Sequence, residues 1–413
     1  MRVRWLCLAA LVAVAPVVLA GCGGVGVSGA SEATGNQLAV YSSLPLQGPD
    51  AAISAEIVDG ERLALSQAGG HVGQFKVGYV SLDDANPQNG RLDPEATSTN
   101  AKTAAQDTST IAYLGELGSA ATAVSLPLIN AAGILQVSPA SPYVGLTSAL
   151  DAGQDEPERF YPSGKRNFGR LQPGDPAQAS AQVQLMQSLG VHRLYVLDDQ
   201  DPFEVPLGEI VAGDAQQAGI TLVGHDSIAT SSPTTNAYAG EVEKIERKRP
   251  DAVFFAGGAQ PGAVALWQAL HEADPHLLLL GTSALAEPPF LEAIGAPAAA
   301  QTYLTTPILP LADYPPQAAR ALADYRRQFG GRPGPYALYG YEAMSVVLDA
   351  IRRAGDHGND RQTVIDRFLQ TSNRDSVLGR YSMLSSGETT LDRYGVDRVS
   401  DGHTSFYKAF SIG

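Results

Sequence analysis

Histidine and cysteine, which most often supply metal ligands and nucleophiles, are sparse in this chain. Only His271 and His276 stand close together, with Glu272 and Asp274 between them. Because residues five positions apart do not share a helix face, we interpret this group as a solvated helix end rather than a metal site. The sequence contains no GxSxG, HExxH or CxxC pattern. The chain therefore favours binding over catalysis, without cofactor or metal, and a hydrolase is the alternative from a different functional class.

A binding group of another kind follows the segment IAYLG at 111–115. After that predicted strand the chain turns through Glu116, Leu117 and Gly118 into a predicted helix that begins near Ser119. The first amides of a helix have no partner within the helix and can bind a carboxylate. Ser119 could instead simply cap its own helix, and the two roles are compatible.

Two sets of alternating strands and helices position these groups. In the first set, strands are predicted at 38–43, 75–82, 111–115 and 134–138, with helices at 50–67, 94–107 and 119–132. In the second set, strands are predicted at 193–198, 221–225, 251–256 and 277–281, with helices at 175–189, 204–218, 236–248 and 261–272. Asp175 and Pro176 have the residue types of an N-cap and a first helical position. This alternation predicts two α/β lobes with parallel sheets.

Length and composition agree with two lobes in a globular protein. The chain has 413 residues, more than one hydrophobic core usually supports, and 44% of them are hydrophobic and 17% charged. The formal net charge is -15, so the chain as a whole repels phosphate. A broad nucleic-acid surface is therefore excluded.

The N-terminus has the pattern of an export signal. Arg2 and Arg4 precede an apolar run from Trp5 to Leu19, which is shorter than a membrane span. The following Leu-Ala-Gly-Cys looks like a bacterial lipobox, with Cys22 as the lipidated residue. We expect residues 1–21 to be removed and Cys22 to hold the protein at the outer face of a membrane. An ordinary cleavage site with a chance cysteine is the alternative.

The segment after Cys22 is rich in Gly, Ser and Ala. Residues 22–37 are expected to form a flexible tether that makes no core contact. Two GxGxxG matches occur at its start, but neither follows a strand, so we reject both as nucleotide fingerprints. The only other cysteine is Cys7, within the signal, and the mature fold is expected to have no disulfide.

Several segments in order resemble a known family. They include LPLQGPDAAISAEIVDGERLALSQAGG, IAYLGELGSAATAVSLPLINAAGILQVSPAS, RLYVLDDQDPFEVPLG, DAVFFAGGAQPGAVALWQAL and YALYGYEAM. Together they cover most of residues 38–385 and are similar to the type I periplasmic solute-binding proteins of ABC transporters, closest to the leucine/isoleucine/valine-binding group. The resemblance implies two doubly wound parallel-sheet lobes that are joined by three crossovers and close on a small solute.

The resemblance also places the lobe boundaries. Crossings are expected near 171–174, 305–308 and 380–383. One lobe would comprise 38–172 plus 306–381, and the other 173–305 plus 382–413. The implied partners are a small-molecule solute, the permease subunits of an ABC importer and, through the lipid, a membrane. A tethered ligand-sensing subunit on the same fold is the alternative.

The first lobe supplies half of the implied ligand site. The family grips a ligand carboxylate at positions that correspond to Ser119 and Ala120, and Ala120 lacks the hydroxyl that members often have there. Ala140 and Ser141 match the next ligand segment, where carbonyls and a hydroxyl meet the solute. Pro142 stands where amino-acid binders tend to carry Thr, and Ser141 could replace that donor.

The second lobe departs further from the family pattern. Phe203 matches a position usually occupied by a ligand-covering Tyr, with a plain core aromatic as the alternative. Gly258 matches another aromatic site, and its lack of a ring would enlarge the pocket. Ile53, from the first lobe, adds an apolar wall where the family often has Tyr. Ser283 stands where amino-acid binders carry an acid that pairs with the ligand ammonium.

The residue type at Ser283 governs the expected ligand. A buried ammonium needs a countercharge, which Ser283 cannot supply, although Glu116 or Glu287 could reach in from neighbouring loops. We therefore expect leucine, isoleucine and valine to bind weakly. A small polar carboxylate or amide without an ammonium group remains as plausible as an amino acid.

Overall fold

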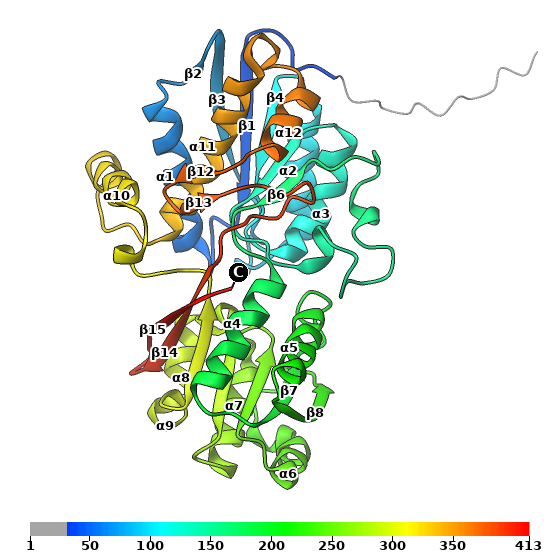
Figure 1. The fold of residues 1–413 in the computed structure, drawn as a ribbon, viewed down its shortest axis with the longest axis vertical. Coiled ribbons are helices and arrows are strands. Elements are labelled where there is room, and N and C mark those ends of the chain that lie inside the picture. Colours follow the sequence, from blue (N-terminus) through cyan, green and yellow to red (C-terminus); the bar gives the residue numbers. More distant parts are fainter. Residues whose placement is uncertain (1–30, 413) are drawn as a thin grey trace, which may run out of the picture.

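The computed structural model describes residues 31–412 and consists of two α/β lobes, one above the other in Figure 1. The first lobe is built on a six-stranded sheet with the order β2-β3-β1-β4-β5-β6. The second lobe is built on a seven-stranded sheet with the order β15-β14-β11-β10-β9-β7-β8. This arrangement confirms the predicted fold class of two doubly wound lobes.

The first lobe contains two separate stretches of chain. Its strands are β1 (Gln37–Leu44), β2 (His71–Val72), β3 (Phe75–Asp83), β4 (Thr110–Leu114), β5 (Leu135–Ser138) and β6 (Phe168–Arg170), with a small hairpin of β12 (Arg374–Ser376) and β13 (Gly379–Tyr381). Its helices are α1 (Ala51–Gln67), α2 (Pro94–Gln106), α3 (Ser119–Ala131), α10 (Pro316–Phe329), α11 (Tyr336–Ala354) and α12 (Arg361–Leu369).

The second lobe contains most of the remaining elements. Its strands are β7 (Arg193–Asp198), β8 (Thr221–Ser227), β9 (Ala252–Ala256), β10 (Leu278–Thr282), β11 (Thr302–Thr306), β14 (Arg393–Ser400) and β15 (His403–Ser411). Its helices are α4 (Asp175–Ser188), α5 (Val205–Gln217), α6 (Ala239–Lys248), α7 (Pro261–Ala273), α8 (Pro288–Ala293) and α9 (Gly295–Ala299). The pair β14 and β15 is antiparallel and extends the parallel sheet at β11.

In both sheets the strand order reverses at an internal strand. This reversal creates a crevice at the carboxyl ends of the strands. In the first sheet β1 lies between β3 and β4, and in the second β7 lies between β8 and β9. The chain therefore leaves β1 and β4, or β7 and β9, toward opposite sides. Ligands of open α/β sheets bind outside the carboxyl ends of the strands at such points.

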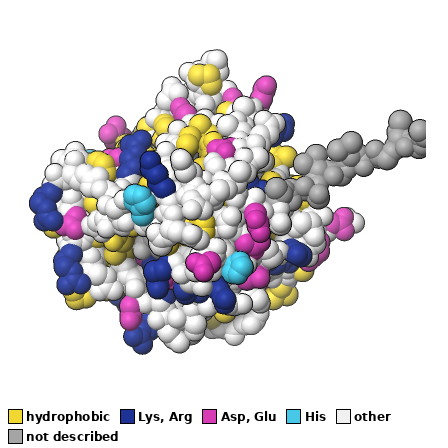
Figure 2. All heavy atoms as spheres, turned by 90° about the horizontal axis from the view of Figure 1, so that it is seen from above, with side chains coloured by type: hydrophobic (Ala, Val, Ile, Leu, Met, Phe, Trp, Pro, Cys, Tyr) yellow, Lys and Arg dark blue, Asp and Glu magenta, His cyan; other side chains and the backbone are white. Residues whose placement is uncertain are grey.

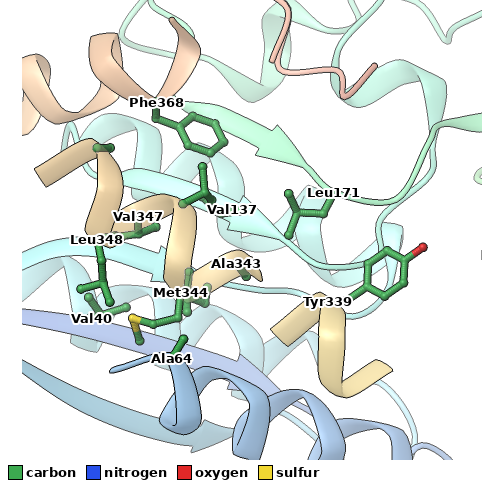
Figure 3. Packing of buried hydrophobic residues seen from close by; sticks show 14 of the residues in the cluster. Val40, Ala64, Val137, Leu171, Tyr339, Ala343, Met344, Val347, Leu348 and Phe368 are labelled. Atoms are coloured by element: carbon green, nitrogen blue, oxygen red, sulfur yellow. The ribbon is translucent and has the colours of Figure 1, made fainter. Parts of the chain in front are cut away.

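The core of the first lobe lies between the sheet and helices α1 and α11. Val40 and Val137 from the sheet pack against Met344 and Val347 of α11 (Figure 3). The two helices touch closely where one of them has a glycine: a Cβ on Gly340 would lie 2.0 Å from a backbone oxygen of α1. Any larger residue there would force the helices apart, so this glycine permits the close packing.

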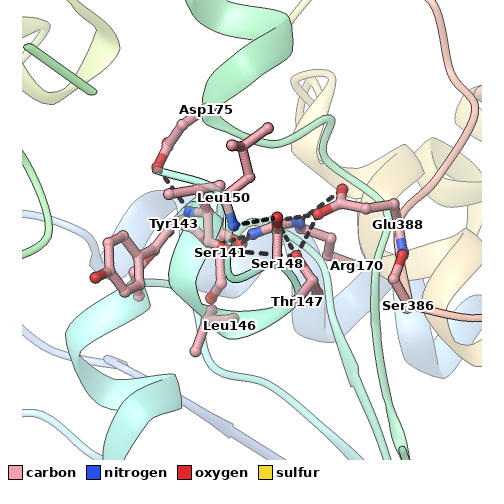
Figure 4. A network of polar contacts seen from close by, with 12 residues as sticks. Ser141, Tyr143, Leu146, Thr147, Ser148, Leu150, Arg170, Asp175, Ser386 and Glu388 are labelled. Atoms are coloured by element: carbon pink, nitrogen blue, oxygen red, sulfur yellow. Dashed lines mark hydrogen bonds and ion pairs between the residues drawn. The ribbon is translucent and has the colours of Figure 1, made fainter. Parts of the chain in front are cut away.

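A buried arginine joins the segments that pass between the lobes. Arg170 ends β6 and is fully buried, and its Nη1 donates to the backbone oxygens of Ser141 and Tyr143, each at 2.7 Å (Figure 4). Its Nε donates to Glu388 Oε2 at 3.0 Å, and its Nη2 also pairs with Glu388. Thr147 completes the group by accepting a bond from Nη2 at 2.7 Å.

The chain makes its third crossing between the lobes later than expected. After β13 the amide of Met383 still donates to the oxygen of Thr371 at 2.9 Å, and Glu388 pairs with Arg170 of the first lobe. Only at Arg393 does β14 join the second sheet. The expected crossing at 380–383 is therefore too early, because residues 384–391 still run along the first lobe, and Asp392 is the first to bond with the second.

The expected tether is also shorter than its composition indicated. Ser31 O accepts a bond from the amide of Arg361, and the amide of Ala33 donates to Asn359 O at 2.7 Å. Ala33 is 1% exposed and belongs to the core of the first lobe. The expectation of no core contact up to residue 37 is wrong for 31–37. The signal segment, Cys22 and residues 23–30 lie outside the described residues.

The end of the first lobe that faces away from the second carries both signs of charge. Figure 2 shows Lys and Arg side chains and Asp and Glu side chains across this face, with uncharged surface between them. Within residues 31–412, none of the helices combines the length and apolarity that a bilayer crossing requires.

Candidate functional site

A cavity of about 430 Å³ lies between the two lobes, at the carboxyl ends of the strands. From the first lobe it is lined by the segments after β1, β3, β4 and β5 and by the starts of α1, α3 and α11. From the second lobe it is lined by the segments after β7, β9 and β10 and by the starts of α4 and α5. Both crevices thus open into one shared space.

The first-lobe wall includes the N-terminus of α3. The first intrahelical bond runs from the amide of Thr122 to Gly118 O at 3.0 Å, which leaves the amides of Ser119, Ala120 and Ala121 before it. All three residues line the cavity. Ser119 does not cap its own helix: its Oγ accepts a bond from the amide of Tyr143 at 3.1 Å. The helix end is therefore open to an acceptor from the cavity.

The segment after β5 differs from the arrangement that the sequence predicted. Ala140 and Pro142 line the cavity, whereas Ser141 is fully buried behind them. The hydroxyl of Ser141 hydrogen-bonds with Thr122 Oγ1 at 2.7 Å and Ser138 Oγ at 2.9 Å. Ser141 therefore holds this segment against α3, and it is not positioned to replace the donor that is missing at residue 142.

The second-lobe residues singled out in the sequence all reach the cavity. Phe203, Gly258 and Ser283 line it, together with Ile53 of the first lobe. A Cβ built on Gly258 would meet no atom within 4 Å, so the absence of a ring there leaves open space. Ser283 begins a short 3-10 turn directly after β10.

Six carboxylates in the cavity wall were not expected. The first lobe contributes two and the second four: Asp50, Asp84, Asp175, Asp199, Asp201 and Glu204. Among the described lining residues none is Lys, Arg or His. The expectation that the pocket lacks an acid for an ammonium is therefore wrong. Glu116 and Glu287, the two acids that the sequence suggested for this role, are not part of the wall.

The four second-lobe acids are close enough to perturb one another. Burial, and then the neighbouring Asp175, Asp199 and Asp201, raise the pKa of Glu204 to about 8. Burial raises the pKa of Asp175 to about 7, although Arg170 and the amide of Val144 act in the opposite direction. No cation lines the cavity among the described residues, and Arg170 acts on Asp175 from outside the wall. A cation in the cavity would therefore stabilise the charged forms of these carboxylates.

The start of α4 differs from the expected one, in which Asp175 was the N-cap. Gly174 is the N-cap, and Asp175 is the first helical residue. Its Oδ2 accepts the amide of Val144 at 2.8 Å, a contact with the first lobe across the crossing. The side chain thus joins the two lobes rather than capping its own helix.

Asp84 and Glu116 form a buried acid pair at the back of the first-lobe wall. Burial raises the pKa of both carboxyl groups, and that of Glu116 is raised well above its ordinary value, with the neighbouring Asp84 as a further cause. Tyr113 donates to Glu116 Oε1 at 2.6 Å. The pKa of Glu116 is raised further because two buried charges side by side would repel each other.

Two side-chain contacts bridge the cleft. The rings of Tyr143 and Phe203 meet edge to face, with centroids 5.1 Å apart. Arg91 Nη2 lies 3.7 Å from Glu287 Oε2. Each contact joins a residue of the first lobe to one of the second. The lobes are thus in contact around the cavity.

The described part of the chain was also compared with the side-chain groupings that bind metal ions. Between residues 31 and 412, no group of three or more His, Cys, Asp or Glu could hold a metal ion.

The comparisons with known proteins agree with this architecture. The family model described as periplasmic binding protein matches residues 42–403, which is most of the chain. The chain belongs to the periplasmic binding protein family. No curated protein matches this binding protein in sequence.

Solved structures resemble this binding protein over nearly its whole length. A leucine binding protein from Thermotoga maritima is 21% identical, with a TM-score of 0.73, and the match covers 91% of this chain and 99% of that one. A substrate-binding protein from Desulfitobacterium hafniense complexed with Leu is 18% identical, with a TM-score of 0.70 and coverage of 90% and 100%. A solute-binding protein from R. palustris in complex with benzoate is 15% identical, with a TM-score of 0.69 and coverage of 91% and 96%. At these identities the likeness concerns the fold.

Two acids of the cavity are recognisable in the sequence because each stands at the end of a strand. Asp84 directly follows β3, and Asp199 directly follows β7. Polar residues at the carboxyl ends of parallel strands converge on one edge of a sheet. Applied to both lobes, this rule places carboxylates in the site.

Proposed function

We propose that this protein is the extracytoplasmic solute receptor of an ABC importer, which captures a small amino-bearing solute between its lobes and delivers it to the permease. The observation that carries this proposal is the cavity of about 430 Å³ that both lobes line. A solute that touches both walls interacts more strongly with the closed protein than with the open one. Only such differential affinity can drive closure.

The walls offer complementary groups for a polar solute. The free amides at the start of α3 suit a carboxylate or another acceptor, and the carboxylates of both lobes suit an ammonium group. An amino acid presents both groups, which supports amino-acid transport as the function. The acid-rich wall argues against a simple carboxylate without an ammonium, which the sequence alone left equally plausible.

Anchoring through Cys22 is part of the same proposal. The apolar run from Trp5 to Leu19 and the cysteine after it support export and lipid attachment. The described residues begin at Ser31, so eight residues, 23–30, lie between Cys22 and the first described residue. That spacing would keep the first lobe close to the membrane.

A ligand screen tests the proposal. Purified protein would be heated in the presence of amino acids, amines, carboxylates and ureas, and compounds that raise the melting temperature would be titrated by calorimetry. Small-angle scattering should then show a smaller radius of gyration with the bound compound. Mass spectrometry should recover the compound unchanged. Turnover would instead indicate the hydrolase, and a panel without any binding compound would contradict the receptor.

A further inference from the structure

The charges of the cavity wall are unusually one-sided. Six carboxylates line it and none of the described lining residues is cationic. An amino acid such as leucine brings one ammonium and one carboxylate, so it is neutral overall. Its ammonium would offset only one of these six groups. Outside the wall, Arg91 acts on Asp50 and Arg170 acts on Asp175, so the carboxylates still outnumber the cations around the cavity.

Two of the carboxylates have no hydrogen-bond or ion-pair partner among the described residues, and they come from opposite lobes. Asp50 precedes α1 in the first lobe and makes no side-chain bond to that helix. Glu204 precedes α5 in the second lobe and likewise makes none. Both side chains are partly exposed, and the cation that acts on Asp50, Arg91, is paired with Glu287. Asp50 and Glu204 thus have capacity for groups supplied by a ligand.

A third carboxyl group, that of Asp175, also has capacity to bind a ligand. Asp175 is 2% exposed, lines the cavity beside Glu204, and uses only Oδ2, for the amide of Val144. Its Oδ1 receives no hydrogen bond from the described residues. A nearly buried residue that lines the cavity therefore has an acceptor atom without a hydrogen-bond donor, although Arg170 lies near enough to act on its charge.

The remaining wall suits the carbon chain between two charged groups. Ile53 and Leu117 of the first lobe and Phe203 and Leu207 of the second lobe line the same cavity. Apolar side chains of this kind bind methylene groups. The cavity thus combines acids on both lobes with apolar surface between them.

We propose that the solute carries two cationic amino or guanidino groups, one bound by Asp50 in the first lobe and the other by Glu204 and Asp175 in the second. This inference rests on the proposed receptor function and specifies its substrate class. A diamine and a basic amino acid share this chemistry. They differ in the carboxylate, which only the amino acid could place at the start of α3.

Isothermal titration with five probes tests the inference: putrescine, cadaverine, L-lysine, L-leucine and benzoate. At least one of the three dicationic probes should bind about tenfold or more tightly than leucine, and benzoate should not compete. Tighter binding of L-lysine than of both diamines would show that the carboxylate site at α3 is used. The reverse order would show that the two cations suffice.

Charge-removing variants in both lobes make the test specific. Glu204→Gln and Asp50→Asn should each weaken the dicationic probe roughly tenfold or more, because each removes one of its two counterions. Glu209→Gln is the matched control, since Glu209 is exposed on α5 and does not line the cavity. If one variant fails to fold, the other reports on the opposite lobe.

Two outcomes would overturn the inference without touching the receptor function. Leucine could bind as tightly as every dicationic probe, or none of the dicationic probes could bind while another compound of the wider panel does. Failure of every compound in that panel would instead overturn the proposed receptor function, and the inference with it.

Discussion

Tyr143 and Phe203 close one side of the cavity by contact across the cleft. Their ring centroids are 5.1 Å apart and their planes are inclined at 83°. Tyr143 lies between β5 and β6 of the first lobe, and Phe203 lies between β7 and α5 of the second. The hydroxyl of Tyr143 also donates to Glu156 Oε2 at 2.5 Å, so the ring that Phe203 touches is held on its own lobe.

Removing the ring of Phe203 should therefore weaken closure more than folding. An edge-to-face aromatic pair contributes about 0.5–1.5 kcal/mol beyond its buried area. We expect Phe203→Ala to bind a cavity ligand several-fold more weakly and to increase the radius of gyration of the liganded protein. Phe406→Ala, on the exposed face of β15, should change neither. Unaltered affinity in Phe203→Ala would contradict the role of this contact.

The Arg170 network predicts a strong effect on stability. Arg170→Met leaves Glu388, which is only partly buried, without its cation and removes the donors to the backbone oxygens of Ser141 and Tyr143. Breaking one partner of a buried pair usually lowers the free energy of unfolding by about 3–5 kcal/mol. Urea denaturation measures this loss. Arg247→Met, at an exposed helical pair with Glu243, should lose no more than about 0.5 kcal/mol. Similar losses in both variants would contradict the network.

Two neighbouring glycines should respond differently to the same substitution. A Cβ on Gly257 would lie 2.4 Å from the Phe255 ring, whereas one on Gly258 meets no atom within 4 Å. Gly257→Ala should therefore lower the free energy of unfolding by about 1–3 kcal/mol, and Gly258→Ala should leave it nearly unchanged. Thermal denaturation of the two variants compares them directly. Equal melting temperatures would show that the Phe255 ring moves aside freely.

The cavity acids predict how stability depends on pH. Burial raises the pKa of Glu204 to about 8 and that of Asp175 to about 7, above the ordinary range near 4. The folded protein then binds more protons than the unfolded chain between about pH 4 and pH 8. Linkage requires the free energy of unfolding of the ligand-free protein to fall as pH rises through this window.

Glu204→Gln isolates the contribution of one group to that slope. Because the amide does not titrate, the variant should be more stable than wild type at pH 8 and nearly equal to it at pH 4. Chemical denaturation at both pH values measures the difference, with Glu209→Gln as the control. A stability difference that is the same at pH 4 and pH 8 would show that Glu204 titrates normally.

Lipid attachment predicts a change in partitioning. Cys22→Ser should remove the acylated residue but leave the fold intact, because residue 22 precedes the described fold. Detergent phase separation of the two proteins after expression in a bacterial host tests this. Wild type should enter the detergent phase and the variant the aqueous phase. An aqueous location for both proteins would contradict the anchoring, whereas equal melting temperatures would show that the fold is unaffected.

The order of the elements could be inferred from the sequence because its signals are local. The segments at 38–43 and 193–198 are short apolar runs between helical patterns, and both form strands in the structure, β1 and β7. The N-terminus of α3 is recognisable in the same way, from a predicted strand, a turn with Gly118 and a following helical pattern. These features depend on residues that are neighbours in the chain.

The composition of the site was decided by tertiary structure. Ser141 was expected at the cavity, but its hydroxyl is buried against Thr122 of α3. Arg170 and Glu388 are 218 residues apart and meet only because two crossing segments run together.

Tertiary structure also decides which acids meet in the cavity. Asp50 and Glu204 lie in different lobes and face one space because each precedes a helix at the carboxyl edge of its sheet. A local pattern shows that such a residue is polar and where its strand or helix ends. Which residues of the other lobe it faces depends on strand order and on how the lobes meet, and the charge of the cavity follows from that arrangement.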